Sequence, residues 1–230
     1  MIETYLDQLA RELDFDRALS RRVRLEVEDH LWEAAATNRS GDSFEAQRRA
    51  VANFGDARAV AAEFAVVSLA RASRRAGIAA LVVIAGVFMA MKARVAWYAA
   101  LQWAIGDDMR ALGSVVILID RYAFLSSLII ALGGWIYIHS RRIPSAFDPA
   151  YRRQLGRFFL LCAVAAAALV VSVISDAVLT ALQLRGAGLS PEFVLPILSM
   201  AIEIAGVRVL VLRIRSVALR AASTAALTRR

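Results

Sequence analysis

The chain has 230 residues, 59% of them hydrophobic, and a mean hydropathy of +0.56, which exceeds that of ordinary soluble domains. Charge is divided unevenly, because residues 1–70 carry a net −4 and residues 71–230 a net +12. The pI of about 10.6 would suit a nucleic-acid-binding protein, but the positive charges flank apolar runs, which indicates membrane topology instead.

The sequence lacks the residues and motifs on which several kinds of catalysis and metal or cofactor binding depend. The single cysteine, Cys162, lies in an apolar stretch, so a disulfide framework and a cysteine-based zinc site are excluded within one chain. The sequence has no Walker A motif, no dinucleotide-binding glycine motif and no H-E-x-x-H zinc motif. Its two His residues lie near no suitable nucleophile. We therefore expect no enzyme activity, no catalytic residues, no cofactor and no bound metal.

Residues 1–69 are predicted to form a small domain of four short amphipathic helices, because apolar residues recur there at helical spacing. The four apolar sets are Ile2, Tyr5, Leu6, Leu9 and Leu13; Leu19, Val23, Val27, Leu31 and Ala34; Phe44, Val51 and Phe54; and Val60, Phe64, Val67 and Leu69. The second helix is expected to begin near Asp16, and Gly55 and Asp56 fit the end of the third helix and the cap of the fourth. A domain of this size buries only a small core, so it is expected to dock a partner.

One stretch of this domain carries a family resemblance. Residues 26–34 read E-V-E-D-H-L-W-E-A and look like the E-x-x-x-H-L-x-E-A core of the HAAS domain, also described as permease prefix domain 1. Further residues follow at the spacing of that family: Gly41, Ala46, Ala50 and Phe54-Gly55-Asp56. The resemblance covers residues 1 to about 65. It implies a cytoplasmic helical domain on a small membrane or permease-like protein, often encoded beside a PadR-type transcription regulator.

Five residues of the domain are candidates for docking a partner: Glu26, Asp29, His30, Trp32 and Phe54. For His30 the simplest interpretation is a hydrogen bond with Glu26, one helical turn earlier. A zinc site would need more ligands than Glu26, His30 and Glu33 provide.

Four apolar segments behind this domain are predicted to span a membrane, at about residues 76–92, 119–138, 158–181 and 193–212. Residues 111–119 either precede the second span or extend it into one long helix. Residues 95–105 are expected to lie along the interface as a short amphipathic helix. In the second span, Gly133 and Gly134 would allow close helix approach.

The distribution of basic residues orients these spans. Thirteen arginines flank one side, and only five basic residues flank the other. By the positive-inside rule, both termini and the loop at 139–157 are expected in the cytoplasm of a bacterium, with the spans in its inner membrane. No cleavable signal peptide precedes the acidic first 30 residues, which agrees with a cytoplasmic N-terminus. The basic tail, residues 213–230, is expected to form a surface helix attracted to anionic lipids. No aromatic residues accompany its charges, so direct nucleic-acid binding is not expected.

Four ionisable residues are predicted to lie within the spans: Arg121, Asp176, Glu203 and Arg208. Charges in a membrane are costly and therefore functional candidates. Asp176 and Arg121 fall at similar heights on neighbouring spans, which favours a bridge between them. Glu203 lies near the middle of the fourth span, and Arg208 is too far around that helix to pair with it. A proton or ion path through Glu203 and Asp176 stays open, as does a contact from Glu203 to a partner subunit.

The sequence thus predicts an all-α protein, a small cytoplasmic helical domain followed by a transmembrane bundle of four spans. Our first hypothesis is a regulatory membrane protein whose cytoplasmic domain docks a transcription regulator, PadR-type or similar. Two alternatives remain: an accessory membrane subunit of a transporter, and an anti-sigma factor that holds a sigma factor. Expected partners are therefore a cytoplasmic regulator or sigma factor, membrane lipids, and a second copy of the chain or another membrane subunit.

Overall fold

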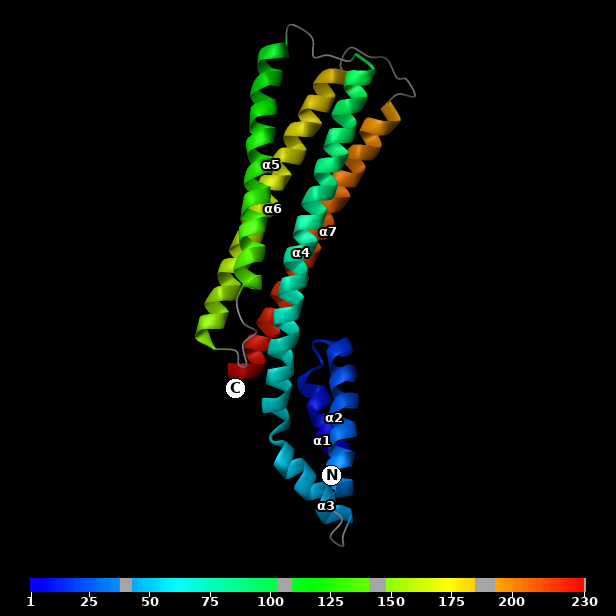
Figure 1. The fold of residues 1–230 in the computed structure, drawn as a ribbon, viewed down its shortest axis with the longest axis vertical. Helices are drawn as coiled ribbons and strands as arrows, with labels where there is room; N and C mark the ends of the chain where they lie inside the picture. Colours follow the sequence, from blue (N-terminus) through cyan, green and yellow to red (C-terminus); the bar gives the residue numbers. More distant parts are fainter. Residues whose placement is uncertain (38–42, 103–108, 141–147, 185–192, 230) are drawn as a thin grey trace. The chain divides into compact units, whose positions relative to one another are not determined.

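The computed structural model of the protein describes residues 1–37, 43–102, 109–140, 148–184 and 193–229. These residues form seven helices and, within those ranges, no strand: α1 Ile2–Glu12, α2 Arg17–Thr37, α3 Ser43–Phe54, α4 Ala57–Ala100, α5 Arg110–His139, α6 Pro149–Leu184 and α7 Val194–Arg229 (Figure 1). The predicted all-α class is confirmed. Gly41, one of the residues of the family resemblance, lies outside the described residues.

The chain divides into two compact units. The first comprises Met1–Ser73, Arg142–Arg153 and Val217–Arg230, and the second comprises Arg74–Arg141 and Gln154–Ser216. Helices α4 and α7 each contribute residues to both units. The end of the chain belongs to the same unit as its beginning.

The core of the first unit joins the apolar faces of α1 and α2. The predicted stripes of both helices are buried except for Ala34, which is half-buried; Leu6, Leu9, Val23 and Leu31 are each 1% exposed or less. Prediction was less successful for the next two helices. Phe44 is exposed, and the inward positions of α4 are the alanines Ala57, Ala61 and Ala65, with Val60 and Phe64 only half-buried. Leu69, from the same predicted set, is buried, so the prediction for α4 was correct in part.

Local capping chemistry sets the ends of these helices. Asp16 accepts a hydrogen bond from the Leu19 backbone N–H at 3.2 Å and so caps α2, which confirms the expected start. Gly55 adopts a φ of +102°, a left-handed conformation that favours glycine after a helix end. Asp56 then caps α4, accepting hydrogen bonds at 3.1 Å from the backbone N–H groups of Arg58 and Ala59.

Replacing Asp56 with Ala is expected to destabilise the first unit by about 1 kcal/mol, because the first turn of α4 would lose its side-chain acceptor. Asp56→Asn, which retains an acceptor, is the control. Chemical denaturation of the full chain, followed by amide exchange in residues 57–66, measures the effect. Equal stability of the Ala and Asn variants would contradict the capping role.

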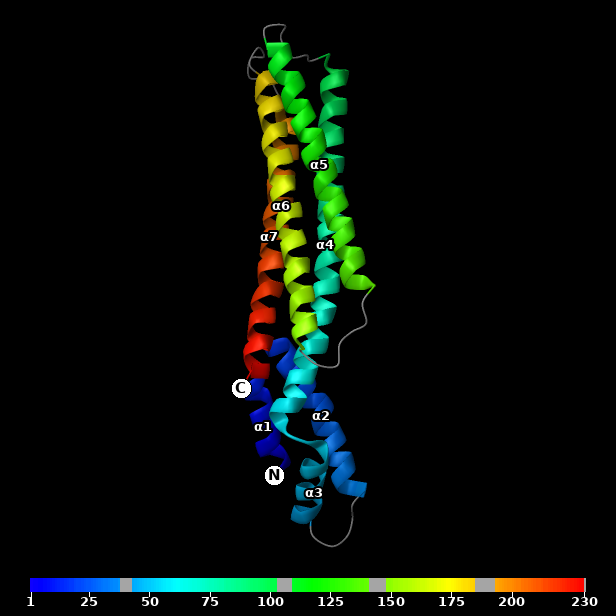
Figure 2. The same ribbon diagram turned by 90° about the vertical axis from the view of Figure 1, so that its left-hand side faces the viewer.

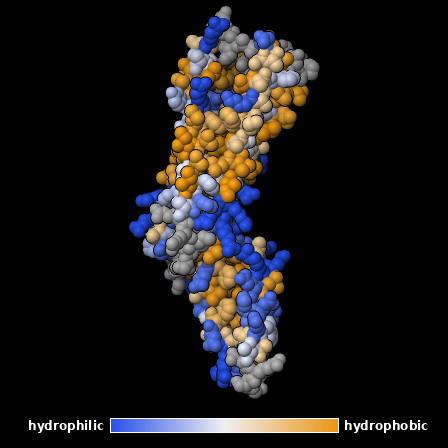
Figure 3. Space-filling view, viewed as in Figure 1, coloured by the Kyte–Doolittle hydropathy of each residue, from blue (hydrophilic) through white to orange (hydrophobic). Residues whose placement is uncertain are grey.

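The second unit is a bundle of four helices, and both ribbon views show α4–α7 side by side (Figures 1 and 2). Each of the four is long and apolar enough to cross a membrane. On the face shown in Figure 3, apolar side chains gather over these helices. The most apolar part of α5 is only 11% buried against 44% in α6, so α5 turns most of its apolar surface outward, as a helix facing lipid does.

The long helices resolve two points about the spans. Residues 111–119 belong to α5, which makes one long helix with Asp120 and Arg121 inside it. Residues 95–100 continue α4, so the predicted interfacial helix at 95–105 is wrong for this part. Residues 103–105 lie outside the described part of the chain.

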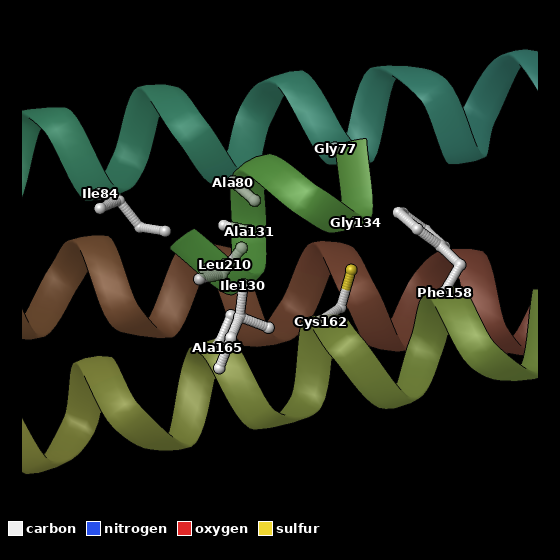
Figure 4. Close-up of a pocket in the computed structure, with 10 residues that line it drawn as sticks. All are labelled: Gly77, Ala80, Ile84, Ile130, Ala131, Gly134, Phe158, Cys162, Ala165 and Leu210. Atoms are coloured by element: carbon white, nitrogen blue, oxygen red, sulfur yellow. The ribbon is translucent and has the colours of Figure 1, made fainter. Parts of the chain in front are cut away.

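Glycines bring the bundle helices close together. A Cβ atom added at Gly77 would lie 3.1 Å from Cδ1 of Trp135, and one at Gly134 would lie 3.5 Å from Cβ of Leu161. Figure 4 shows Gly77 and Gly134 on adjacent helices, with Cys162 of α6 beside them. The space they enclose measures about 10 Å³, no larger than one water molecule needs, so it is a packing feature. Gly134 thus meets the expectation of close approach, whereas a Cβ at Gly133 would meet nothing within 4 Å.

Candidate functional site

The exposed face of α2 holds four of the five candidate docking residues. Glu26, Asp29, His30 and Trp32 are all exposed. Leu25, which the sequence analysis did not single out, is 59% exposed, and Trp32 is 44% exposed. Leu25, Asp29 and Trp32 recur at i, i+4 and i+7, so they form one stripe along the helix. We call these three residues the α2 stripe: two large apolar side chains with an acidic residue between them.

Phe54, the fifth candidate, has a different role. It packs edge-on against Tyr5, with ring centroids 6.1 Å apart and an interplanar angle of 82°. Burial, and secondarily the negative charge of Asp56, raise the pKa of the Tyr5 phenol above its ordinary value. Phe54 is half-buried against the core and is therefore chiefly a structural residue.

The proposed pairing of Glu26 with His30 does not appear in the structure. No hydrogen bond or ion pair joins their side chains in the described part of the chain. The described residues contain no group of three His, Cys, Asp or Glu side chains placed to hold a metal ion. His30 is thus an exposed polar residue beside the α2 stripe.

The second unit contains a buried ionic cluster, which we call the Arg94 cluster. Nη2 of Arg94, on α4, contacts both Oδ2 of Asp176 on α6 and, at 2.8 Å, Oε1 of Glu203 on α7. Arg94 is fully buried, and Asp176 and Glu203 are 6% and 1% exposed. One positive and two negative groups therefore join three helices inside the bundle.

Three hydroxyl groups lie around the Arg94 cluster, and one of them contacts a carboxylate. Oγ of Ser199 lies 2.9 Å from Oε1 of Glu203 and 3.0 Å from the carbonyl oxygen of Ala90. On the other side, Tyr98 donates to Oγ1 of Thr180 at 3.2 Å, and Thr180 donates to the Asp176 carbonyl at 2.9 Å. Ser199 thus orients the Glu203 carboxylate, whereas Thr180 contacts only the backbone of Asp176.

The predicted bridge between Asp176 and Arg121 is wrong, because Asp176 pairs with Arg94. Arg121 and Arg208 are exposed on the bundle, and within the described residues neither forms an ion pair. Asp120, beside Arg121, instead accepts a hydrogen bond from Ser172 at 2.6 Å.

Arg94 itself was missed as a site residue, since it follows the apolar run and reads as a flanking charge. The position of Arg94 in the helical repeat of α4 could have identified it as buried. The inward residues of α4 recur at alternating spacings of three and four: Ile84, Val87, Met91, Arg94 and Tyr98. This periodicity places Arg94 on the buried face.

The end of the chain contacts the N-terminal helices within the first unit. Nη1 of Arg220 lies 3.0 Å from Oδ2 of Asp16, and Arg58 donates to the carbonyl oxygen of Leu227 at 2.9 and 3.2 Å. Leu227 belongs to the core cluster of that unit. Residues 217–227 therefore contact protein, whereas the sequence predicts a surface helix attracted to lipid.

Comparison with known families matches the HAAS family over residues 4–63. The N-terminal domain is a HAAS domain. It comprises α1–α3 and the first turns of α4, and the four membrane-length helices follow it in the same chain. No curated protein and no solved structure matches the chain.

Proposed function

We propose that the chain is a regulatory protein of the bacterial inner membrane, and that its HAAS domain docks a cytoplasmic transcription regulator, PadR-type or similar. The single observation that carries the proposal is the α2 stripe on a domain fused to four membrane-length helices. Leu25 and Trp32 are large apolar side chains held in solvent, and exposed apolar groups of this kind mark interaction sites. The proposal assigns no catalytic step to the chain.

The orientation supports a cytoplasmic partner. Thirteen arginines flank the side expected to hold both termini, against five basic residues on the other, and this asymmetry supports a cytoplasmic HAAS domain. Acidic residues flank the α2 stripe, among them Glu26, Glu28 and Glu33. A matching partner surface would combine basic groups with an apolar pocket for Trp32.

Site-specific photocrosslinking in cells tests this docking surface. Replacing Trp32 with p-benzoylphenylalanine in the full chain is expected to yield an adduct with a DNA-binding regulator or a sigma factor. The matched control places the same group at Ala52, an exposed position on α3. A sigma factor in the adduct would favour the anti-sigma alternative over a PadR-type regulator. Equal adducts from both positions, or adducts with integral membrane proteins alone, would refute docking through the α2 stripe.

The Arg94 cluster favours a second candidate function, that of an accessory subunit of a transporter. A cavity of about 700 Å³ lies between α4, α5 and α6, and its lining includes Lys92, Asp120, Arg121 and Asp176. Charged groups on a membrane cavity are typical of substrate or ion pathways. Ile202, 50% exposed beside Glu203, provides the test. A photoreactive group there is expected to capture a transporter subunit if this function is correct, and only lipid if it is not.

A further inference from the structure

The HAAS domain of this chain binds a helix from the opposite end of the sequence. The surface that receives it is formed by the α1–α2 turn, which includes Asp16, and by the first turns of α4, which include Arg58. The helix is the last part of α7, residues 217–227. We call this part the C-terminal segment and the surface the receiving surface.

One face of the C-terminal segment is buried, and Arg220 and Leu227 on it contact the domain. Val217, Thr224 and Leu227 are 5%, 1% and 9% exposed, and Arg220 lies between them in sequence with its guanidinium on Asp16. These four residues recur at spacings of three, four and three, which is the repeat of helices that pack along a common seam. The other face of the segment is exposed and includes Leu219 and Ala222.

The polar contacts between the segment and the domain lie at the margin of the domain. The Arg220 side chain is 44% exposed in its ion pair, and half-exposed ion pairs add little to binding. Leu227 is the one residue of the segment in the core cluster, which is otherwise built from α1–α4. Such a contact can open without unfolding the HAAS core, and a competing helix can therefore replace it.

We infer that the receiving surface is a second recognition site of the HAAS domain, which the C-terminal segment occupies in exchange with a basic amphipathic helix of the docked regulator. The partner helix has a basic residue facing Asp16, and small or aliphatic residues four and seven positions later. Its C-terminal carbonyl accepts from Arg58, as the carbonyl of Leu227 does. This inference rests on the proposed function only for the identity of the partner, because the exchange itself is a property of this chain.

Pulsed EPR on the full chain in lipid nanodiscs tests the exchange without any regulator. Spin labels are attached at Arg17→Cys and Leu219→Cys, two exposed positions beside the ion pair, in a Cys162→Ser background. The probe is a peptide of residues 213–230 in large molar excess. We expect one short distance in its absence, and an at least about fivefold loss of that population when the peptide is added.

Variants of Arg220 and Leu227, with a matched control, test whether the exchange depends on their contacts with the receiving surface. Arg220→Glu is expected to remove the short distance without peptide, because it places two acidic groups together, whereas Arg220→Lys retains the charge and the short distance. Arg215→Glu makes the same charge change at an exposed position with no ion pair in the described part of the chain, and is expected to leave the distance unchanged. The peptide carrying Leu227→Glu should not compete.

Two results would overturn the inference. Absence of the short distance in the otherwise unaltered chain would show that the segment does not dock. A short distance that withstands both the peptide and Arg220→Glu would show that the segment is a fixed part of the domain. Neither result involves the regulator, so failure of the α2-stripe crosslink and failure of the exchange are separate outcomes. Where a regulator is captured, Arg220→Glu is expected to raise its recovery about fivefold.

Discussion

Replacing Arg94 with Gln is expected to destabilise the membrane bundle by about 3–5 kcal/mol, because Asp176 and Glu203 would remain buried without their cation. Titration of the purified chain with a denaturing detergent, followed by far-ultraviolet circular dichroism, measures the change.

Two sets of variants serve as controls for this prediction. Lys92→Gln and Arg121→Gln remove exposed charges near the same level and are expected to cost less than about 1 kcal/mol. The triple variant Arg94→Leu, Asp176→Asn and Glu203→Gln removes all three charges and is expected to recover most of the loss. If Arg94→Gln were as stable as Lys92→Gln, the cluster would not hold the three helices together.

Replacing Leu31 with Ala is expected to destabilise the HAAS domain by about 2–5 kcal/mol. Leu31 is fully buried in the core cluster, and its truncation leaves a cavity in a domain too small to compensate for it. Proteolysis of the native full chain, scored by cleavage within residues 1–69, reports how often the domain opens.

The control for this core prediction is Leu25→Ala, on the same helix. Leu25 is 59% exposed, so its truncation is expected to leave the cleavage rate nearly unchanged. The two leucines therefore separate stability from docking: Leu31→Ala should open the domain, and Leu25→Ala should weaken only capture of the partner. Equal cleavage rates in the two variants would contradict the assigned core.

Helical periodicity predicted the architecture because it is a property of each segment alone. The stripes of α1 and α2, the caps at Asp16 and Asp56, and the four long apolar helices all follow from local spacing. The same principle failed on α4 within the HAAS domain. The residues of α4 that pack inward there are alanines: Ala57, Ala61 and Ala65. Alanine is less hydrophobic than Val60 and Phe64, so a hydrophobic pattern favours those two neighbours instead.

The ionic partners could not be predicted, because they depend on which faces of separate helices meet. Arg121 was the expected partner of Asp176, and only the packing of α4 against α6 brings Arg94 to it instead. The buried face of α7 also has a repeating pattern in the sequence. Ser199, Glu203 and Leu210 continue in phase into Val217, Thr224 and Leu227, which indicates that the tail packs on protein.

Crosslinked affinity purification from native membranes, with the tag on the N-terminus, tests most directly whether the HAAS domain docks a cytoplasmic regulator. Proteins that co-elute with the full chain are identified by mass spectrometry and compared with those from a chain lacking residues 1–69, tagged at its new N-terminus. We predict a DNA-binding regulator or sigma factor that is lost with the deletion. Recovery of integral membrane proteins alone, unaffected by the deletion, would contradict the proposed function and place the activity in the bundle.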